Sequence, residues 1–158
     1  MKILVVGNAS SIKGYNPKDY DMVVRLNYGI KEGDCDRWYD GTVHRKSQAK
    51  YSEGKKYKYY RTYTDEKFRR QHIAVPTTYV DATEGSVYRL GLEGSKPSTG
   101  YIAVRNVLEN FTEAMVYLVG YDWYNTNNRQ TSMTGDNPYH NWKMEKRILS
   151  QLDRVIVI

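Results

Sequence analysis

The chain has 158 residues, with 24 Lys and Arg against 18 Asp and Glu, and a formal net charge of +6. Its 40% of hydrophobic residues can form a globular core, and its basic surface attracts anions. No apolar run approaches the roughly 18 residues of a membrane span, and the run after Lys2 is too short for a signal peptide. The lone Cys35 excludes an intrachain disulfide, so we expect a cytoplasmic protein without a membrane span.

The first half of the chain predicts a series of strands. A buried strand at 2–6 ends at Gly7, and a second strand at 21–27 follows a Gly-, Asn-, Ser- and Pro-rich loop with room for one helical turn. Further strands are predicted from Gly41 to Lys46, at 56–64 and at 72–80. Pro76 places the last of these at a sheet edge or a strand end.

The second half alternates helices and strands. A helix is predicted from Thr99 to about Phe111, because its apolar residues form one broad face. An apolar central strand at 114–120 and a long polar loop follow. A second helix is expected from about Pro138 to Leu152, and a last strand at 154–158. This order favours one domain over residues 1–158, built as an open, largely parallel α/β sheet.

Polar residues follow the first two predicted strands, at the edge where open α/β sheets bind ligands. Gly7 and Asn8 come after the first strand, and Asn27 ends the second. Gly7 permits a close backbone approach, and the two amides can bind a base, a ribose or a phosphate. Turn formation is the simpler alternative for both asparagines, since Asn tolerates left-handed backbone.

Polar residues also lie at the two predicted helix starts. Ser98, Thr99 and Gly100 begin the first helix, where free N–H groups and the helix dipole favour a phosphate, although a plain cap is the alternative. Tyr124 can donate its hydroxyl to the same phosphate or anchor its loop. His140 lies near the second helix start, and an ordinary imidazole pKa near 6.5 suits a general base, with a packing role as the alternative.

Three segments, in chain order, resemble the motifs of the sialyltransferases. ILVVGNASSIKGYNPKDYDMVVRLNYG is similar to the large sialyl motif, and KPSTGYIAVRNVLENFTEAMVYLVGYDW is similar to the small one. YHNWKMEKRIL is similar to the very small motif, in which His140 is followed by Glu145. VYLVGYDWYN also resembles a strand and loop of bacterial sialyltransferases, and we expect a bacterial or viral source.

The resemblance implies a Rossmann-like domain of the GT-A-like variant found in sialyltransferases. It implies an inverting, metal-independent transfer of sialic acid, or a related acidic sugar such as Kdo, from a CMP-activated donor to a glycan or glycolipid hydroxyl, with no cofactor. His140 would deprotonate the acceptor, and Glu145, about 140° away round a helix, is expected to be structural. The residues implied at the CMP moiety and its phosphate are Gly7, Asn8, Asn27, Ser98, Thr99, Gly100 and Tyr124.

Three alternatives stay open. Asp34 and Asp36 form an Asp-x-Asp pattern, which in other glycosyltransferases holds a divalent metal beneath a nucleotide diphosphate. The domain can also bind CMP or a glycan without catalysis. The Tyr, Lys and Arg residues of 50–70 suit either a half-exposed strand or single-stranded nucleic acid, although stable nucleic-acid binding explains none of the other motifs.

Overall fold

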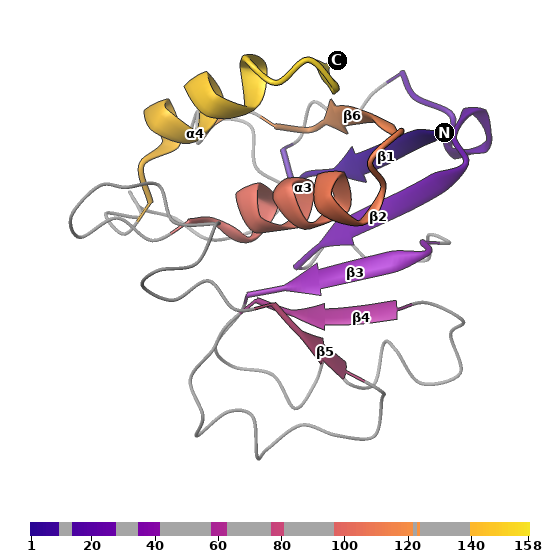
Figure 1. The fold of residues 1–158 in the computed structure, drawn as a ribbon, viewed down its shortest axis with the longest axis horizontal. Helices are drawn as coiled ribbons and strands as arrows, with labels where there is room; N and C mark the ends of the chain where they lie inside the picture. The colour runs from indigo at the N-terminus through magenta and orange to yellow at the C-terminus, as the bar shows by residue number, and fades with distance from the viewer. Residues whose placement is uncertain are drawn as a thin grey trace.

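The computed structural model describes residues 1–9, 14–27, 35–41, 58–62, 77–80, 97–121, 123 and 140–158. These residues contain a seven-stranded sheet in the order β5-β4-β3-β2-β1-β6-β7, and all six strand pairings are parallel (Figure 1). The predicted α/β class with a parallel sheet is therefore confirmed. The strands are β1 (Lys2–Val6), β2 (Met22–Leu26), β3 (Arg37–Asp40), β4 (Lys58–Arg61), β5 (Thr77–Tyr79), β6 (Met115–Val119) and β7 (Val155–Val157).

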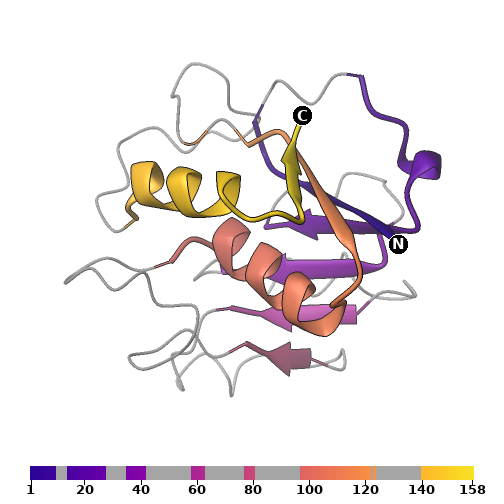
Figure 2. The ribbon, with the colours of Figure 1, turned by 45° about the horizontal axis from the view of Figure 1, so that its top comes forward.

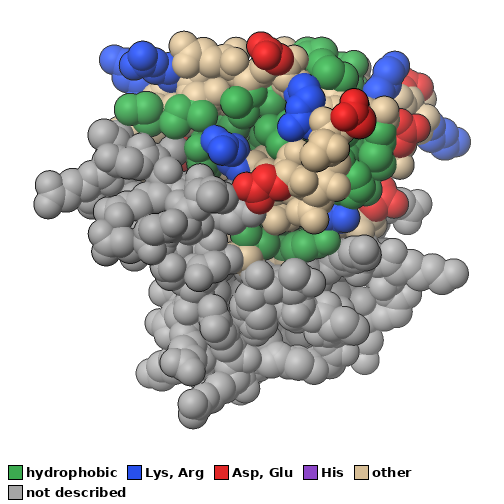
Figure 3. Space-filling view, viewed as in Figure 1, with side chains coloured by type: hydrophobic (Ala, Val, Ile, Leu, Met, Phe, Trp, Pro, Cys, Tyr) green, Lys and Arg blue, Asp and Glu red, His purple; other side chains and the backbone are tan. Residues whose placement is uncertain are grey.

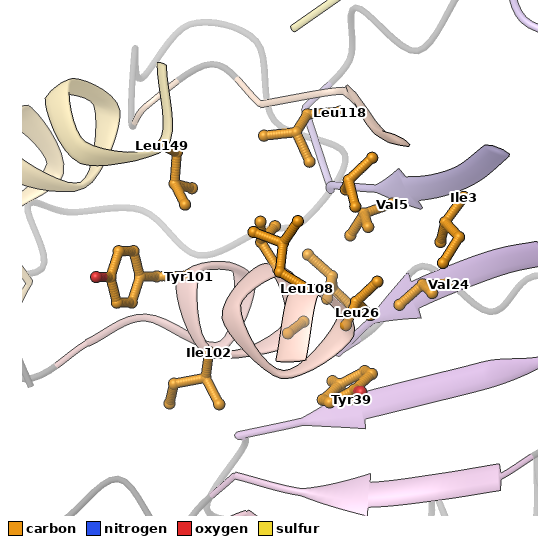
Figure 4. Close-up of a cluster of buried hydrophobic side chains, with 14 of the residues drawn as sticks. Ile3, Val5, Val24, Leu26, Tyr39, Tyr101, Ile102, Leu108, Leu118 and Leu149 are labelled. Atoms are coloured by element: carbon orange, nitrogen blue, oxygen red, sulfur yellow. The ribbon is translucent and has the colours of Figure 1, made fainter. Parts of the chain in front are cut away.

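Two helices, α3 (Thr99–Asn110) and α4 (Trp142–Ser150), lie on the same face of the sheet (Figures 1 and 2). Alternate residues of β1 point to opposite faces, as strand geometry requires. Ile3 and Val5 join the core beneath the helices, whereas Leu4 and Val6 join a smaller cluster on the other face. Both faces of β1 are thus buried, which suits the continuous apolar run in its sequence. Figure 4 shows the helix-side core, in which Leu108 and Leu149 from the two helices pack over the strands.

The strand order changes direction at β1, which lies in the interior of the sheet. Strands β2 to β5 extend to one side of β1, and β6 and β7 extend to the other. Beyond the strands, the Gly7 N–H donates to Val119 O at 2.8 Å and the Ala9 N–H donates to Gly120 O at 3.1 Å. The ends of β1 and β6 therefore form the topological switch point, where ligands bind in open α/β sheets.

Most predicted elements are confirmed, with small shifts at their ends. The predicted strands at 2–6, 21–27, 56–64, 72–80, 114–120 and 154–158 contain β1, β2, β4, β5, β6 and β7. A 3-10 turn at Pro17–Asp19 provides the short helical turn expected in the first loop. Helix α3 begins at Thr99, and Phe111 is its C-cap. Strand β5 follows Pro76 directly and is the outermost described strand on its side, as the proline predicts.

One strand lies where the sequence predicted none, and one helix begins later than predicted. The third strand is Arg37–Asp40 and ends before Gly41, while residues 42–46 lie outside the described residues. Its two buried aromatic residues stand between charged ones, so the segment lacks the apolar run that marks a buried strand. Helix α4 begins at Trp142, not near Pro138, because Asn141 is the N-cap and its Oδ1 accepts from the Met144 N–H at 2.9 Å.

The surface over α3 and α4 carries charges of both signs. Figure 3 shows Lys, Arg, Asp and Glu side chains interspersed on the described part of this face, with no extended stripe of one sign. Within the same described residues, no helix combines the length and the apolar character needed to cross a bilayer. The described helix-covered face therefore does not itself supply a basic patch.

Candidate functional site

The ends of β1 and β6 meet at two glycines. A Cβ atom at Gly7 would lie 2.3 Å from the carbonyl oxygen of Gly120, and Gly120 itself has a φ of 69°. The close backbone approach expected at Gly7 is thus present, and the approaching group is protein backbone. Gly7 is required for the two strand ends to meet, and its contact with a ligand stays a prediction.

Asn8 links the end of β1 to the end of β2. Its Nδ2 donates to Leu26 O at 3.2 Å. Its Oδ1 is buried and accepts no hydrogen bond within the described part of the chain. An unsatisfied buried acceptor costs about 1–3 kcal/mol, so Asn8 Oδ1 is a candidate acceptor for a ligand donor.

Asn27 is a turn residue that links β2 to β3. Its φ is 47°, in the left-handed region, and its Oδ1 accepts from the Gly41 N–H at 3.0 Å. Its own N–H donates to Tyr39 O at 2.9 Å, and its carbonyl accepts from Trp38 Nε1 at 2.9 Å. The turn alternative is therefore confirmed for Asn27, and only its Nδ2 has no acceptor among the described residues.

Ser98 is the N-cap of α3 and is itself held by α4. Its Oγ accepts from the Tyr101 N–H at 3.1 Å, which confirms the helix-cap alternative. The Ser98 N–H donates to Glu145 Oε1 at 2.7 Å, and the Ser98 hydroxyl donates to Glu145 Oε2 at 2.6 Å. The single hydroxyl hydrogen of Ser98 is thus committed to the protein in this arrangement.

The next two residues pack the start of α3 onto strand ends. A Cβ at Gly41 would lie 2.1 Å from Thr99 Oγ1, so the end of β3 touches Thr99 closely. A Cβ at Gly100 would lie 3.1 Å from the Tyr121 hydroxyl oxygen, just beyond β6. The N–H groups of Thr99 and Gly100 donate to no described residue. These two donors and the positive helix end suit an anion.

Glu145 connects the two helix starts. It lies in the first turn of α4, its side chain is 1% exposed, and both of its oxygens accept from Ser98. Burial raises the pKa of Glu145 to about 7, although the two hydrogen bonds from Ser98 oppose that shift. Glu145 thus links the starts of the two helices, as a structural residue does, and its partner 47 residues away has no local signal in the sequence.

Tyr121 is a site residue that the sequence analysis missed. Its hydroxyl donates to Gly100 O at 3.2 Å, and its ring lies 5.4 Å from that of Trp123, which has a φ of 52°. Burial, and secondarily the Glu145 carboxylate, raise the pKa of Tyr121, so it stays protonated. Its position directly after the central strand was the available signal, whereas the predicted Tyr124 lies outside the described residues.

His140 directly precedes the Asn141 cap of α4. Its ring packs edge-on against Trp142, with the centroids 5.1 Å apart. Because Glu145 of the same helix binds Ser98, the chain following His140 is anchored at the start of α3. The general-base role of His140 stays a prediction.

The Asp-x-Asp alternative falls partly within the described residues. Asp36 Oδ2 accepts from the Val23 N–H at 2.7 Å, which gives this carboxylate a place in the β2–β3 connection. Asp34 lies outside the described residues. Within the part of the chain that the structure describes, no three His, Cys, Asp or Glu side chains group as metal ligands would.

These contacts form one connected edge of the sheet, here called the carboxyl edge, where the parallel strands end. Both helices also begin on this side, toward which the strand arrowheads point (Figure 1). Comparison with protein-family models, with curated proteins and with solved structures gives no significant match to this chain. The predicted residues that the contacts bring together are Gly7, Asn8, Asn27, Ser98, Thr99 and Gly100.

Proposed function

We propose that this protein binds a CMP-activated acidic sugar at the carboxyl edge and transfers the sugar to an acceptor hydroxyl, as sialyltransferases do. The observation that carries the proposal is the convergence, at a topological switch point, of residues from separate motif-like segments. A Rossmann-like domain of the GT-A-like variant is part of the same proposal.

The start of α3 would bind the phosphate of the donor. The N–H groups of Thr99 and Gly100 have no other described acceptor, and the positive end of a 12-residue helix lies behind them. Donors fixed in advance stabilise the charge of a leaving phosphate without a metal. Asn8 Oδ1 would accept from an amino or hydroxyl group of the nucleoside.

His140 would act on the acceptor. In the proposed step, the acceptor oxygen attacks the anomeric carbon while its proton passes to the His140 imidazole. The bond between the anomeric carbon and the phosphate oxygen breaks, and its electron pair leaves with CMP. Attack opposite the leaving group inverts the anomeric centre.

A substitution at Thr99 tests the phosphate site with little effect on the helix. Thr99→Pro removes one backbone donor, and proline is tolerated in the first position of a helix. The preceding Ser98 has φ −71° and ψ 159°, which a following proline allows. Thr99→Ala is the matched control, because it shortens the side chain and keeps the N–H.

Calorimetric titration with CMP, with UMP and AMP as specificity controls, gives the readout. We expect selective CMP binding, a loss of about tenfold in affinity for Thr99→Pro and little change for Thr99→Ala. Absence of CMP binding at millimolar concentration, or equal binding of the three nucleotides, would overturn the proposal.

Transfer is tested separately from binding. We expect His140→Gln to bind CMP as the unmodified protein does and to lose transfer from a CMP-sugar. CMP binding without any transfer by the unmodified protein would leave the non-catalytic binding domain as its function. Preference for a single-stranded oligonucleotide over CMP would point instead to the basic, tyrosine-rich segment 50–70.

A further inference from the structure

The direction of the hydrogen bond between the Ser98 hydroxyl and Glu145 depends on whether the Glu145 carboxyl is protonated. Ser98 Oγ accepts from the Tyr101 N–H and donates its only hydrogen to Glu145 Oε2, so Glu145 is an ionised acceptor in this arrangement. Glu145 Oε1 accepts from the Ser98 N–H. Both side chains are buried, at 6% and 1% exposure, so water does not readily replace these partners.

Protonation of Glu145 can reverse one of these bonds without breaking the link. A protonated Oε2 becomes a donor, and Ser98 Oγ has a second lone pair with which to accept from it. The Tyr101 N–H bond and the bond to Glu145 Oε1 are retained. The hydroxyl hydrogen of Ser98 is then released from the carboxylate, and the negative charge behind the first turn of α3 disappears.

Both changes favour an anion at the start of α3. The N–H groups of Thr99 and Gly100 belong to the same helix turn as Ser98, so a charged Glu145 opposes an anion bound to them. A released Ser98 hydrogen adds one donor for that anion. The two effects have the same sign, so anion binding and protonation of Glu145 assist each other.

We propose that the Ser98–Glu145 pair couples anion binding at the start of α3 to the uptake of one proton. This inference rests on the proposed function, because it concerns the regulation of the same phosphate site. The neutral pair is the binding-competent form, and the ionised pair holds the Ser98 hydroxyl away from the ligand.

Among the charged and titratable groups around the Ser98–Glu145 pair, Glu145 is the one expected to change its protonation between pH 6 and pH 8. Burial raises the pKa of Glu145 to about 7, so both of its forms are populated near neutrality. Burial also raises the pKa of Tyr101 and of Tyr121, which therefore stay neutral. The Arg105 guanidinium donates to the Tyr101 hydroxyl at 3.2 Å. His140, at the start of α4, needs a control because histidines titrate in this range.

The probe must keep a fixed charge, since a phosphate monoester such as CMP itself gains a proton near pH 6. The methyl diester of CMP carries one negative charge from pH 6 to pH 8.5. If only the neutral pair binds, its affinity for the unmodified protein falls about tenfold from pH 6 to pH 8. Calorimetry in buffers of different ionisation enthalpy should then detect uptake of close to one proton at pH 8.

Glu145→Gln imitates the protonated pair. The amide oxygen can accept from the Ser98 N–H, and the amide nitrogen can donate to Ser98 Oγ. We expect this variant to bind the diester at pH 8 about as tightly as the unmodified protein does at pH 6, and to take up no proton. A merely structural role for Glu145 predicts weaker binding of the variant at every pH.

Two further variants separate the alternatives. Ser98→Thr keeps the hydroxyl and should keep the pH dependence, as should His140→Gln. Equal affinity of the unmodified protein at pH 6 and pH 8, or binding without proton uptake at pH 8, would overturn the coupling and leave the proposed function standing. No binding of the diester to the unmodified protein at any pH would overturn the proposed function itself, and the coupling with it.

Discussion

The two ends of α3 differ in how their terminal backbone groups are hydrogen-bonded by the rest of the protein. At its C-terminal end, the Arg154 guanidinium donates to the carbonyls of Leu108, Phe111 and Ala114 at 3.2, 2.9 and 3.4 Å. At its N-terminal end, Ser98 satisfies one N–H, and those of Thr99 and Gly100 find no acceptor among the described residues. One end is closed by a side chain from a distant segment, whereas the other keeps two N–H groups that bond to no described residue.

The same contrast extends along the sheet. Among the described residues, the non-glycine residues with positive φ are Asn27 and Trp123, and both follow strand ends at the carboxyl edge. The unsatisfied oxygen of Asn8 and the buried Glu145 lie at that edge as well. Strained backbone and unsatisfied polar groups often lie where proteins bind ligands, which supports the carboxyl edge as the candidate site. The Nη1 atom of Arg37, near the other end of α3, is also buried without a partner among the described residues.

The largest effect on stability is expected at Gly7, where the backbone of β1 and that of Gly120 leave no room for a side chain. Gly7→Ala places a Cβ 2.3 Å from Gly120 O, and the neighbour is backbone that cannot rotate away. We expect a loss of about 3 kcal/mol or more in the free energy of unfolding, measured with urea. Gly100→Ala is the control, because its nearest neighbour is the Tyr121 hydroxyl at 3.1 Å. Equal losses for the two variants would contradict the rigidity assigned to the switch point.

Removing the closure of the other end tests the comparison directly. Arg154→Met removes the guanidinium bonds to the carbonyls of Leu108, Phe111 and Ala114, of which the Phe111 carbonyl still accepts from the Ala114 N–H at 3.1 Å. We therefore expect a loss of about 2–4 kcal/mol in stability. CMP affinity at a temperature where the variant is folded should stay unchanged. Arg154→Lys should recover part of the loss, because one ammonium cannot reach all three carbonyls. A fall in CMP affinity without a fall in stability would contradict the assignment of a structural role to the C-terminal end of α3 and of ligand binding to its N-terminal end.

The pH dependence of stability isolates Glu145. Because burial raises its pKa to about 7, the folded protein holds this proton up to about pH 7, while the unfolded chain releases it near its ordinary value of 4.5. Stability from this group is therefore full below about pH 4.5 and is lost as the pH rises to about 7. We expect the unmodified protein to lose roughly 1–3 kcal/mol more than Glu145→Gln across that window, measured by urea unfolding. Parallel stability curves for the two proteins would show that Glu145 has an ordinary pKa.

The smallest effect is expected at Arg37, near the closed end of α3. Its guanidinium is buried against the rings of Tyr60 and Phe111, at 5.1 and 4.6 Å, and forms no ion pair with a described residue. Arg37→Met loses these contacts but also the cost of burying a charge, so we expect a change within about 1 kcal/mol. Diester affinity should not change. A large loss in stability would mean that the charge itself organises this end.

The sequence predicted those parts of the fold that depend on local patterns. Continuous apolar runs indicated β1 and β6, and a broad apolar face indicated α3 together with its Ser98 cap. Strand β3 was missed because Trp38 and Tyr39, although buried, lie between Arg37 and Asp40. The local pattern of a four-residue segment with both charged and aromatic residues does not reveal that tertiary packing buries it on both faces of the sheet.

At the candidate site, even more of the structure depends on contacts between distant residues, which local sequence patterns do not predict. Sequence position placed Asn8, Asn27 and Ser98 at one edge, and the contacts agree. The pairing of Ser98 with Glu145, and of Gly7 with Gly120, joins residues far apart in the chain. Such pairs are set by how the helices cross the sheet, which no local propensity encodes.

The interior position of β1 has a consequence for how the chain acquires its structure. Ile3 to Val6 pair on one side with β2, which is close in sequence, and Lys2 to Val6 pair on the other side with Met115 to Val119. During synthesis, one side of β1 keeps unpaired backbone groups until β6 has left the ribosome. Non-local pairing of this kind slows folding and prolongs the exposure of apolar strands. We therefore expect the nascent chain to depend on chaperones until β6 has emerged and paired with β1.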